Sequence, residues 1–397
     1  MTDALGHLTA QWLDALAAEL PGAHELRREL HQAPEVSGKE TATAKRVAAA
    51  MGVAITPVAE TGGYGRFGPR TGPSVGLRGE LDALPVVEKT GLEWASTNGA
   101  MHACGHDVHL AALTAVVRAA RDLDLPYALV PLLQPREEAY PSGARDIEAA
   151  GVLTSQQVAH VIGAHVHPGV ALGAVATGAG FVNAEAGDLD IEVSGQGGHG
   201  AYPHAGADVA AAVAQIVTGL PEMLRRVVDP MEPVVISVGT IQVGNGAANV
   251  LPDHGRILAT IRTTGPETTE RLVEAVSRFV AAQAAAYDCT GTLTHTLGEP
   301  ALINDDELVE VLDAELEQAG LRPTEPMRSL GADDFSFFSE VVPSVMCFVG
   351  VHSAGRHSLH DATFLPDDGA LERVARTFIA GYIAACRRLD AAEGQGD

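Results

Sequence analysis

Short apolar runs alternate with helical patterns in the first half of the chain, and this alternation limits the folds that it can adopt. The runs from Val75 to Leu81, Tyr127 to Leu133 and Ala159 to Val166 each have the length and composition of a buried strand. Between the first two, apolar residues at helical spacing predict a helix from His106 to Leu123. This order is typical of a layered α/β domain.

The stretch from Met101 to His109 has the composition of a metal site. Cys104 and His106 flank Gly105, whose conformational freedom lets residues two apart converge on one centre. Thiolate and neutral imidazole both suit Zn²⁺ and related divalent ions, and His102 and His109 lie within reach. A buried cysteine beside solvated histidines would explain the same stretch equally well.

Further segments supply other types of metal ligand. An acidic pair, Glu137 and Glu138, follows the apolar run that ends at Leu133, on a loop at the edge of the sheet where open α/β sheets bind ligands. Isolated histidines follow at His165 and His360. Taken singly, adjacent glutamates are usually solvated and a lone histidine is usually structural, so the pattern is informative only as a set.

Composition and charge exclude several classes of protein. The 397-residue chain carries a formal net charge of −25 and lacks the basic surface that nucleic-acid binding requires. Four scattered cysteines are too few for a disulfide scaffold and fit a reducing compartment. Leu13, Leu16 and Leu20 predict an amphipathic first helix rather than a signal peptide. No apolar run reaches the ~20 residues that span a bilayer, so we expect a cytoplasmic protein that binds neither nucleic acid nor membrane.

Several short motifs occur along nearly the whole chain in order. They are Arg27–His31, Gly76–Pro85, His102–His109, Gln134–Glu138, Gly195–His199, Asn249–Asp253, Gly331–Phe335 and Leu359–His360. With these motifs the chain resembles the M20 metallopeptidase and amidohydrolase group, in particular its aminoacylase, hippurate hydrolase and auxin-conjugate hydrolase branch. Such a set at compatible spacing is a far stronger signal than any one motif.

The composition changes around Thr177 to Gly180, and the order of predicted elements changes with it. The next elements are a strand, a helix, two strands, a helix and a strand, which is the βαββαβ order of a ferredoxin-like module. They run from 188 to 194, 207 to 228, 234 to 243, 256 to 263, 268 to 287 and 290 to 296. We therefore expect an α/β catalytic domain formed by 1–179 and 292–397, with an inserted lid or dimerisation domain at 180–291.

The segment Gly195–Gly200 also matches the dinucleotide pattern G-x-G-x-x-G. In a dinucleotide site the glycines open a helix directly, whereas here Tyr202–Gly206 intervenes and no consecutive parallel βαβ pair surrounds them. Nucleotide binding is therefore the weaker interpretation. The glycines fit better a loop that presents His199.

The resemblance to the M20 group implies a centre of two divalent metal ions in each subunit. In that group Cys104 would bridge the ions, and the remaining ligands would be His106 and His165 on one ion and Glu138 and His360 on the other. Glu137 matches the general base of the family. Zinc or manganese is the first expectation, with cobalt or nickel as alternatives.

The resemblance also assigns roles outside the metal ligands. His199 would stabilise the oxyanion from the neighbouring subunit of a homodimer, and Asn249 and Arg262 would hold the carboxylate of the substrate. Asp82 is expected to hydrogen-bond a ligating imidazole, with a solvated turn acid as the simpler alternative. Glu80 stands where family members usually carry aspartate, so its role stays open.

These features predict a metal-dependent amidohydrolase. Its expected reaction is cleavage of an N-acyl amino acid into a carboxylic acid and a free amino acid. One alternative keeps the metal chemistry and takes a dipeptide, as a dipeptidase or carboxypeptidase does. A second alternative is a degenerate protein that only binds amides. The acyl group, the amino acid, its stereochemistry and the native metal do not follow from the sequence.

Overall fold

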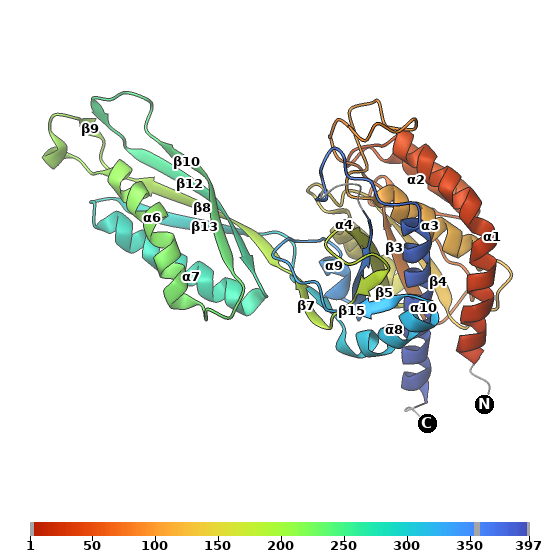
Figure 1. Cartoon of the computed structure of the whole chain (residues 1–397). Helices are drawn as coiled ribbons and strands as arrows, with labels where there is room; N and C mark the ends of the chain where they lie inside the picture. Colours follow the sequence, from red (N-terminus) through yellow and green to blue (C-terminus); the bar gives the residue numbers. More distant parts are fainter. Residues whose placement is uncertain (1–3, 353–357, 395–397) are drawn as a thin grey trace. The chain divides into compact units, whose positions relative to one another are not determined.

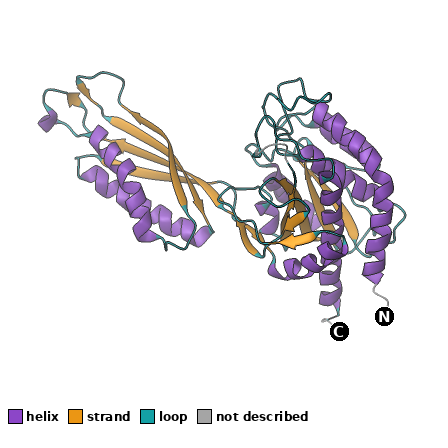
Figure 2. Cartoon of the chain, viewed as in Figure 1, coloured by secondary structure: helices purple, strands orange, loops and turns teal. Residues whose placement is uncertain are grey.

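The chain divides into two compact units in the computed structural model, which describes residues 4–352 and 358–394. Unit 1 combines Met1–Val182, Ile303–Met327 and Asp334–Asp397, and unit 2 combines Asn183–Leu302 with Arg328–Asp333. Each unit has its own sheet, coloured by sequence in Figure 1 and by secondary structure in Figure 2.

Unit 1 contains an eight-stranded sheet with the order β1-β2-β4-β3-β5-β16-β6-β15. Its central strands β4, β3, β5 and β16 are parallel, and every residue of β3, β4 and β16 is buried. Such strands are covered on both faces. The bounds are β1 (Thr56–Val58), β2 (Gly62–Tyr64), β3 (Ser74–Glu80), β4 (Ala128–Gln134), β5 (Val158–His167), β6 (Ala174–Ala176), β15 (Arg322–Thr324) and β16 (Ser344–Gly350).

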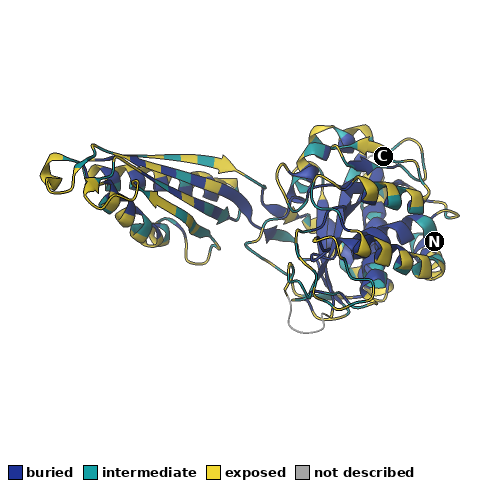
Figure 3. Cartoon of the chain, turned by 90° about the horizontal axis from the view of Figure 1, so that it is seen from above, coloured by how far each residue is buried: buried dark blue, intermediate teal, exposed yellow. Residues whose placement is uncertain are grey.

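Helices cover both faces of this sheet. On β5, Ile162 packs against Gly381 of α10, while the next residue, Gly163, lies against Phe335 at the start of α9. Trp12 anchors α1 to α3 by donating its indole hydrogen bond to the carbonyl of Val116 at 3.0 Å. Figure 3 shows the resulting buried interior. The helices are α1 (Ala4–Gln32), α2 (Thr41–Met51), α3 (His106–Ala119), α4 (Gly143–Ala149), α5 (Val152–Ser155), α8 (Asp306–Gln318), α9 (Ser336–Ser339) and α10 (Ala370–Glu393).

The apolar runs of the sequence correspond to the central strands. The predicted strands at 75–81, 127–133 and 159–166 become β3, β4 and β5 with ends shifted by one residue, and the predicted helix at 106–123 becomes α3, which ends four residues earlier. The layered α/β prediction for this part of the chain is confirmed. Among the described residues, no helix is both long and apolar enough to cross a membrane.

Unit 2 has the predicted ferredoxin-like order of elements. Its antiparallel sheet has the order β10-β12-β8-β13, and α6 and α7 pack on one face. Burial alternates along β12, as expected when only one face of a sheet is covered. The bounds are β8 (Glu185–Ser194), α6 (Val209–Val227), β10 (Val235–Val243), β12 (His254–Thr263), α7 (Pro266–Ala285) and β13 (Thr290–Leu297).

Smaller elements complete the two units. A two-stranded sheet joins β9 (Gly198–His199) to β11 (Val250–Leu251), and the short 3₁₀ helix η1 (Pro203–Ala205) follows β9. A second two-stranded sheet, of β7 (Gly180–Asn183) and β14 (Leu302–Asn304), forms where the chain passes between the units.

The second boundary expected from the sequence, 291/292, falls inside β13. This strand pairs with β8 from Thr290 to Leu297, so it cannot be divided between two units. Unit 2 consequently extends to Leu302 and includes the distant segment Arg328–Asp333. That segment joins unit 2 through a hydrogen bond from the amide of Ala184 to the carbonyl of Gly331 at 2.9 Å.

Candidate metal centre

The predicted ligands of unit 1 gather at the carboxyl ends of its central strands. The chain passes from β3 through α3 to β4 on one side of β3, and then to β5 on the other side. The order of strands therefore reverses between β3 and β5. Open α/β sheets bind their ligands at the carboxyl ends of the strands at such a switch point.

Gly105 shapes the turn that carries Cys104 and His106. Its φ is 87°, in the left-handed region, and an added Cβ would lie 2.4 Å from a methyl carbon of Val166. Only glycine fits this position without displacing β5. The turn caps α3, which begins at His106.

Cys104 lies buried at the centre of the cluster, with Sγ 3.4 Å from Nε2 of His165. Burial raises the pKa of the thiol well above its ordinary value, and the carboxylates of Glu138 and Glu137 raise it further. Without a cation the group is therefore a neutral thiol. A divalent ion would displace its proton, as ligation of cysteine requires.

His106 and His165 are both buried at this cluster, and each binds a main-chain carbonyl through its Nδ1 atom. Nδ1 of His106 donates to the carbonyl of Asp82 at 2.8 Å, and Nδ1 of His165 donates to the carbonyl of Val166 at 2.8 Å. Nε2 of His106 is buried and has no hydrogen-bond partner. Burial holds the pKa of His165 well below its ordinary value, so that ring is neutral. Both Nε2 atoms are available as metal ligands.

Asp82 contacts His106 through its main chain rather than its carboxylate. The nearer carboxylate oxygen lies 3.7 Å from Nδ1 of His106. The other oxygen accepts hydrogen bonds from Ser37 Oγ at 2.7 Å and from the amide of Glu138 at 2.9 Å. One residue thus orients His106 and also fixes the loop that carries Glu138.

Glu138 and His360 form the other side of the cluster, where Oε1 and Nε2 lie 3.2 Å apart. His360 has a φ of 68°, and its amide donates to the carbonyl of Ala103 at 3.0 Å, which ties it to the Cys104 turn. Ligand atoms of Cys104, His106 and Glu138 lie within 4.8 Å of one another. Thiol, imidazole and carboxylate in this arrangement fit a divalent cation.

From the last residue of β4 into the loop that follows, every second residue donates a hydrogen bond to a buried carboxylate. These bonds run from Gln134 Nε2 to Asp334 (2.7 and 2.8 Å), from Arg136 N to Glu40 (3.0 Å) and from Glu138 N to Asp82 (2.9 Å). Glu137 lies within this loop, with Oε2 3.6 Å from Nε2 of His106. Its carboxylate is thus held beside the cluster.

Glu80 and His109 also lie at the cluster, although the sequence assigned a role to neither. Ligand atoms of Glu80, His106, His109 and His165 also lie within 4.8 Å of one another, and all four residues are buried. His109 was visible in the sequence as a histidine three residues after His106. That spacing on a helix places both rings on the same face.

The three candidate site residues of unit 2, His199, Asn249 and Arg262, do not all lie close to one another. His199 on β9 pairs with Val250 on β11, and the amide of Gly200 donates to the carbonyl of Asn249 at 2.8 Å, so His199 and Asn249 are neighbours. Arg262 lies near the far end of β12, eight residues beyond His254. At about 3.4 Å per residue this is roughly 27 Å. Within one copy of unit 2, Arg262 therefore lies far from His199 and Asn249.

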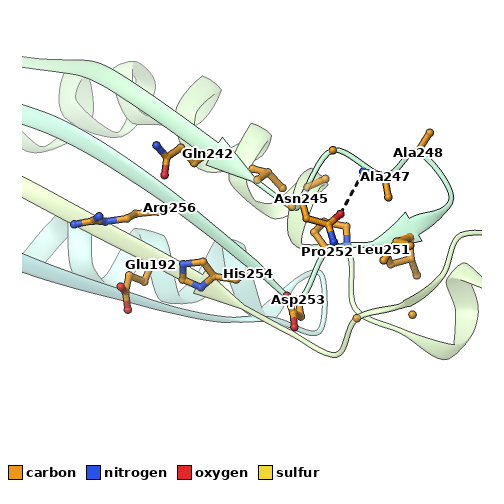
Figure 4. A pocket seen from close by; sticks show the side chains of 17 residues that line it. Glu192, Gln242, Asn245, Ala247, Ala248, Leu251, Pro252, Asp253, His254 and Arg256 are labelled. Atoms are coloured by element: carbon orange, nitrogen blue, oxygen red, sulfur yellow. Dashed lines mark hydrogen bonds between the residues drawn. The ribbon is translucent and has the colours of Figure 1, made fainter.

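A cleft of about 1110 Å³ opens in unit 2 beside β9 and β11 (Figure 4). Its polar lining includes Glu192, Gln242, Asp253, His254 and Arg256. None of the described residues that line it belongs to the predicted site. The cleft nevertheless borders two of them, because Gly198 precedes His199 and because Ala248 and Val250 flank Asn249.

Comparison with known proteins finds relatives that are named as a hydrolase, a deacetylase and a peptidase. The chain is 33% identical to an N-acetyl-L-cysteine deacetylase of Bacillus subtilis, over 96% of this chain and 91% of the relative. It is 34% identical to a Synechocystis protein named only in general terms, as a hydrolase, over 89% of this chain and 92% of the relative. A solved Bacillus subtilis structure, described as a dinuclear metal binding peptidase from the M20 family, matches with a TM-score of 0.81 and 27% identity, over 92% of this chain and 98% of that one.

The family description "Peptidase family M20/M25/M40" matches residues 76–383. This range includes most of β3, all of β4, β5 and β16, the metal-ligand cluster and unit 2. The chain is a hydrolase of amide bonds, and it belongs to peptidase family M20/M25/M40.

Proposed function

We propose that this protein is a two-metal amidohydrolase that cleaves N-acyl amino acids into a carboxylic acid and a free amino acid. The observation that carries the proposal is the cluster at the carboxyl ends of β3, β4 and β5, which is buried apart from the half-buried Glu138 and the exposed His360. There Cys104, His106 and Glu138 converge, with His165 3.4 Å from the thiol and His360 3.2 Å from Glu138.

Five residues would hold the two ions. Cys104 would bridge them, with His106 and His165 on one and Glu138 and His360 on the other. The unpartnered, buried Nε2 of His106 supports the assignment, because a buried polar atom normally has a partner. Thiolate, imidazole and carboxylate suit zinc or manganese first, with cobalt or nickel as alternatives. When bound, such a pair of ions lowers the pKa of water and polarises a carbonyl oxygen.

Glu137 would act as the proton carrier. Its carboxylate accepts a proton from the attacking water and then delivers it to the nitrogen of the departing amine. The hydrogen bonds that fix the residues on either side of Glu137 support this role, because a general base must be held in one place. The adjacent acids would thus divide the work, with Glu138 as ligand and Glu137 as base.

Residues of unit 2 would complete the site in a homodimer. His199 would donate a hydrogen bond to the developing oxyanion of the neighbouring subunit, and Asn249 and Arg262 would bind the carboxylate of the substrate. The separation of roughly 27 Å along β12 supports a site shared between two copies, since one unit 2 cannot bring all three side chains to one small molecule.

The substrate class rests on a relative. A protein named as an N-acetyl-L-cysteine deacetylase is 33% identical to this chain along nearly all of both. We therefore place an N-acetyl amino acid among the first substrates to test. The four cysteines are free in the structure, which supports a reducing compartment such as the cytoplasm.

Reconstituted protein tests the proposal directly. The metal-free chain is loaded with Zn²⁺ or Mn²⁺ and supplied with N-acetyl-L-cysteine, other N-acetyl amino acids and dipeptides, and acetate and free amine are measured. Acetate release from an N-acetyl amino acid at a higher kcat/KM than dipeptide cleavage is the expected result. Preferred cleavage of dipeptides would favour a peptidase. Binding without hydrolysis, after verified loading with metal, would favour the degenerate amide-binding protein.

A further inference from the structure

His109 has a defined protonation pattern that excludes it from the metal ligands. The amide of Val166 can only donate, and it donates to Nε2 of His109 at 3.0 Å. Nε2 is therefore the unprotonated nitrogen, and the proton lies on Nδ1, which donates to Oε2 of Glu80 at 3.0 Å. Both ring nitrogens are occupied, so neither is free to bind an ion.

His109 fills a gap between two parallel strands. The ladder between β3 and β5 ends, among the described residues, at the pair Leu77 and Ile162. Glu80 and His165 each lie three residues beyond that pair, where the strands no longer bond to each other. The ring of His109 takes the place of the missing ladder, because it accepts from the main chain of β5 and donates to the last residue of β3.

The residue that His109 holds is directly attached to a predicted metal ligand. Val166 follows His165, and its carbonyl accepts the hydrogen bond from Nδ1 of His165 at 2.8 Å. The amide and the carbonyl of Val166 are thus both used, one by His109 and one by His165. This arrangement fixes the ring of His165 with Nε2 toward Cys104 Sγ.

Glu80 anchors the arrangement from the other side. Its second carboxylate oxygen accepts from the buried guanidinium of Arg78, which also donates to Asp334 at 3.0 Å. Burial opposes ionisation of Glu80, but Arg78 and His109 outweigh it and hold its pKa well below the ordinary value. Glu80 is therefore a fixed carboxylate with a cation on one side and an imidazole on the other.

We propose that Glu80 and His109 are positioning residues that hold the carboxyl end of β5 through Val166 and thereby orient His165 for metal binding. The inference rests on the two-metal function proposed above. Residues that hold metal ligands in place without touching the metal typically contribute 10–100-fold to metal affinity.

Two substitutions at His109 separate its contacts. Glutamine places its amide near the position of Nε2 and can still accept from the amide of Val166, whereas asparagine places its amide near Nδ1 and can still donate to Glu80. We expect His109→Asn to weaken Zn²⁺ binding by about 10–100-fold in competition with a chelator, and His109→Gln to stay within about threefold of the wild type. His160→Gln is the control, because His160 is also a buried β5 histidine but bonds to the carbonyl of Pro343.

A second readout needs no metal. Hydrogen exchange at the amide of Val166 in the metal-free protein should accelerate in His109→Asn and stay slow in His109→Gln and His160→Gln. Wild-type affinity and wild-type exchange in His109→Asn would overturn the proposal while leaving the two-metal function intact. Equal weakening in both His109 variants would also overturn the route through Val166.

The number of metal ions bound per chain tests the competing explanation, in which His109 is itself a metal ligand. If His109 were a ligand, both variants would fall from two ions per chain to one, which would overturn the positioning role. If the wild type itself bound no metal, the proposed function would fail together with this inference. Glu80→Leu removes the acceptor for Nδ1 but keeps the contact with Val166, as His109→Gln does, so it should weaken Zn²⁺ binding about as much as His109→Gln, by about threefold. Unchanged affinity in a folded Glu80→Leu protein would remove Glu80 from the positioning pair.

Discussion

The candidate functional residues of unit 1 and unit 2 differ in their burial and in how close together they lie. In unit 1, Cys104, His106 and His165 are buried and lie within a few ångströms of one another, and both imidazoles are oriented by hydrogen bonds to the main chain. In unit 2, His199 is exposed on a two-stranded sheet with β11, which precedes β12, and Arg262 lies near the far end of β12, roughly 27 Å from His254 at its start.

The difference separates two kinds of contribution to one proposed site. A metal cluster needs several donors at fixed distances, so it must be assembled inside one rigid unit. Residues that act on a substrate only after it binds can come from another copy of the chain. The contrast therefore predicts large effects on metal binding from changes in unit 1, and effects on turnover without loss of metal from changes in unit 2.

Removal of metal should have the largest effect, because every role proposed for unit 1 depends on the ions. Dialysis against a chelator is expected to abolish hydrolysis, and stoichiometric Zn²⁺ or Mn²⁺ should restore it. Metal content is measured by elemental analysis of the same samples. Full activity in protein verified to be free of metal would end the two-metal account.

The adjacent glutamates sharpen the contrast within unit 1. Glu137→Gln should retain both ions and lose about 10²-fold or more in kcat, the usual scale for a general base. Glu138→Gln should instead lose metal affinity, because it removes a ligand. Kinetics and elemental analysis of the matched pair test this division. If Glu137→Gln lost the metal and Glu138→Gln retained it, the two roles would have been exchanged.

Subunit mixing tests whether His199 acts in the metal site of the neighbouring subunit. His199→Ala and Glu137→Gln proteins should each be nearly inactive, with metal retained. If the site is shared, exchange of subunits produces a mixed dimer with one doubly altered site and one intact site. Activity should then return to at most about a quarter of wild-type sites. No recovery after proven exchange would place His199 outside the neighbouring site.

The smallest expected effect concerns stability rather than catalysis. His31 on α1 is held 3.1 Å from both Asp107 and Glu88. Burial lowers its pKa, but the hydrogen bonds to these acids outweigh burial and raise it from 6.5 to about 9. A raised folded pKa stabilises the protein fully below pH 6.5, and this contribution, on the order of 3 kcal/mol, is lost as the pH rises toward 9.

Denaturant midpoints at fixed metal content measure this dependence. The wild type should lose stability between pH 6.5 and 9, and His31→Gln should show a flatter profile over the same window. His24→Gln, a change at a less buried histidine of the same helix, should keep the wild-type decline. Parallel profiles for His31→Gln and the wild type would contradict the buried ion pairs of His31.

The sequence predicted the parts of this fold that depend on local patterns. The apolar runs that became β3, β4 and β5 were placed to within one residue, because buried parallel strands are apolar along their whole length. The second boundary of unit 2 was missed. The segment Arg328–Asp333 joins that unit through a contact with Ala184, far away in the chain, and no local pattern reports such a contact.

The same distinction applies to the site. Residue types and spacing pointed to Cys104 and His106, and the resemblance to the M20 group added Glu138. However, they could not show that Asp82 would bond to His106 through its carbonyl, since a sequence does not separate main-chain from side-chain contacts. The role of His109 depends on where the β3–β5 ladder ends, and that is a property of the assembled sheet.

Anomalous diffraction from crystals of metal-loaded protein is the most direct test of the central claim, that unit 1 alone assembles a complete two-metal centre. The account predicts two anomalous peaks in each chain, with Cys104 Sγ between them, His106 and His165 on one ion and Glu138 and His360 on the other. A single peak, or a peak bound to Nε2 of His109 instead of Cys104, would contradict it.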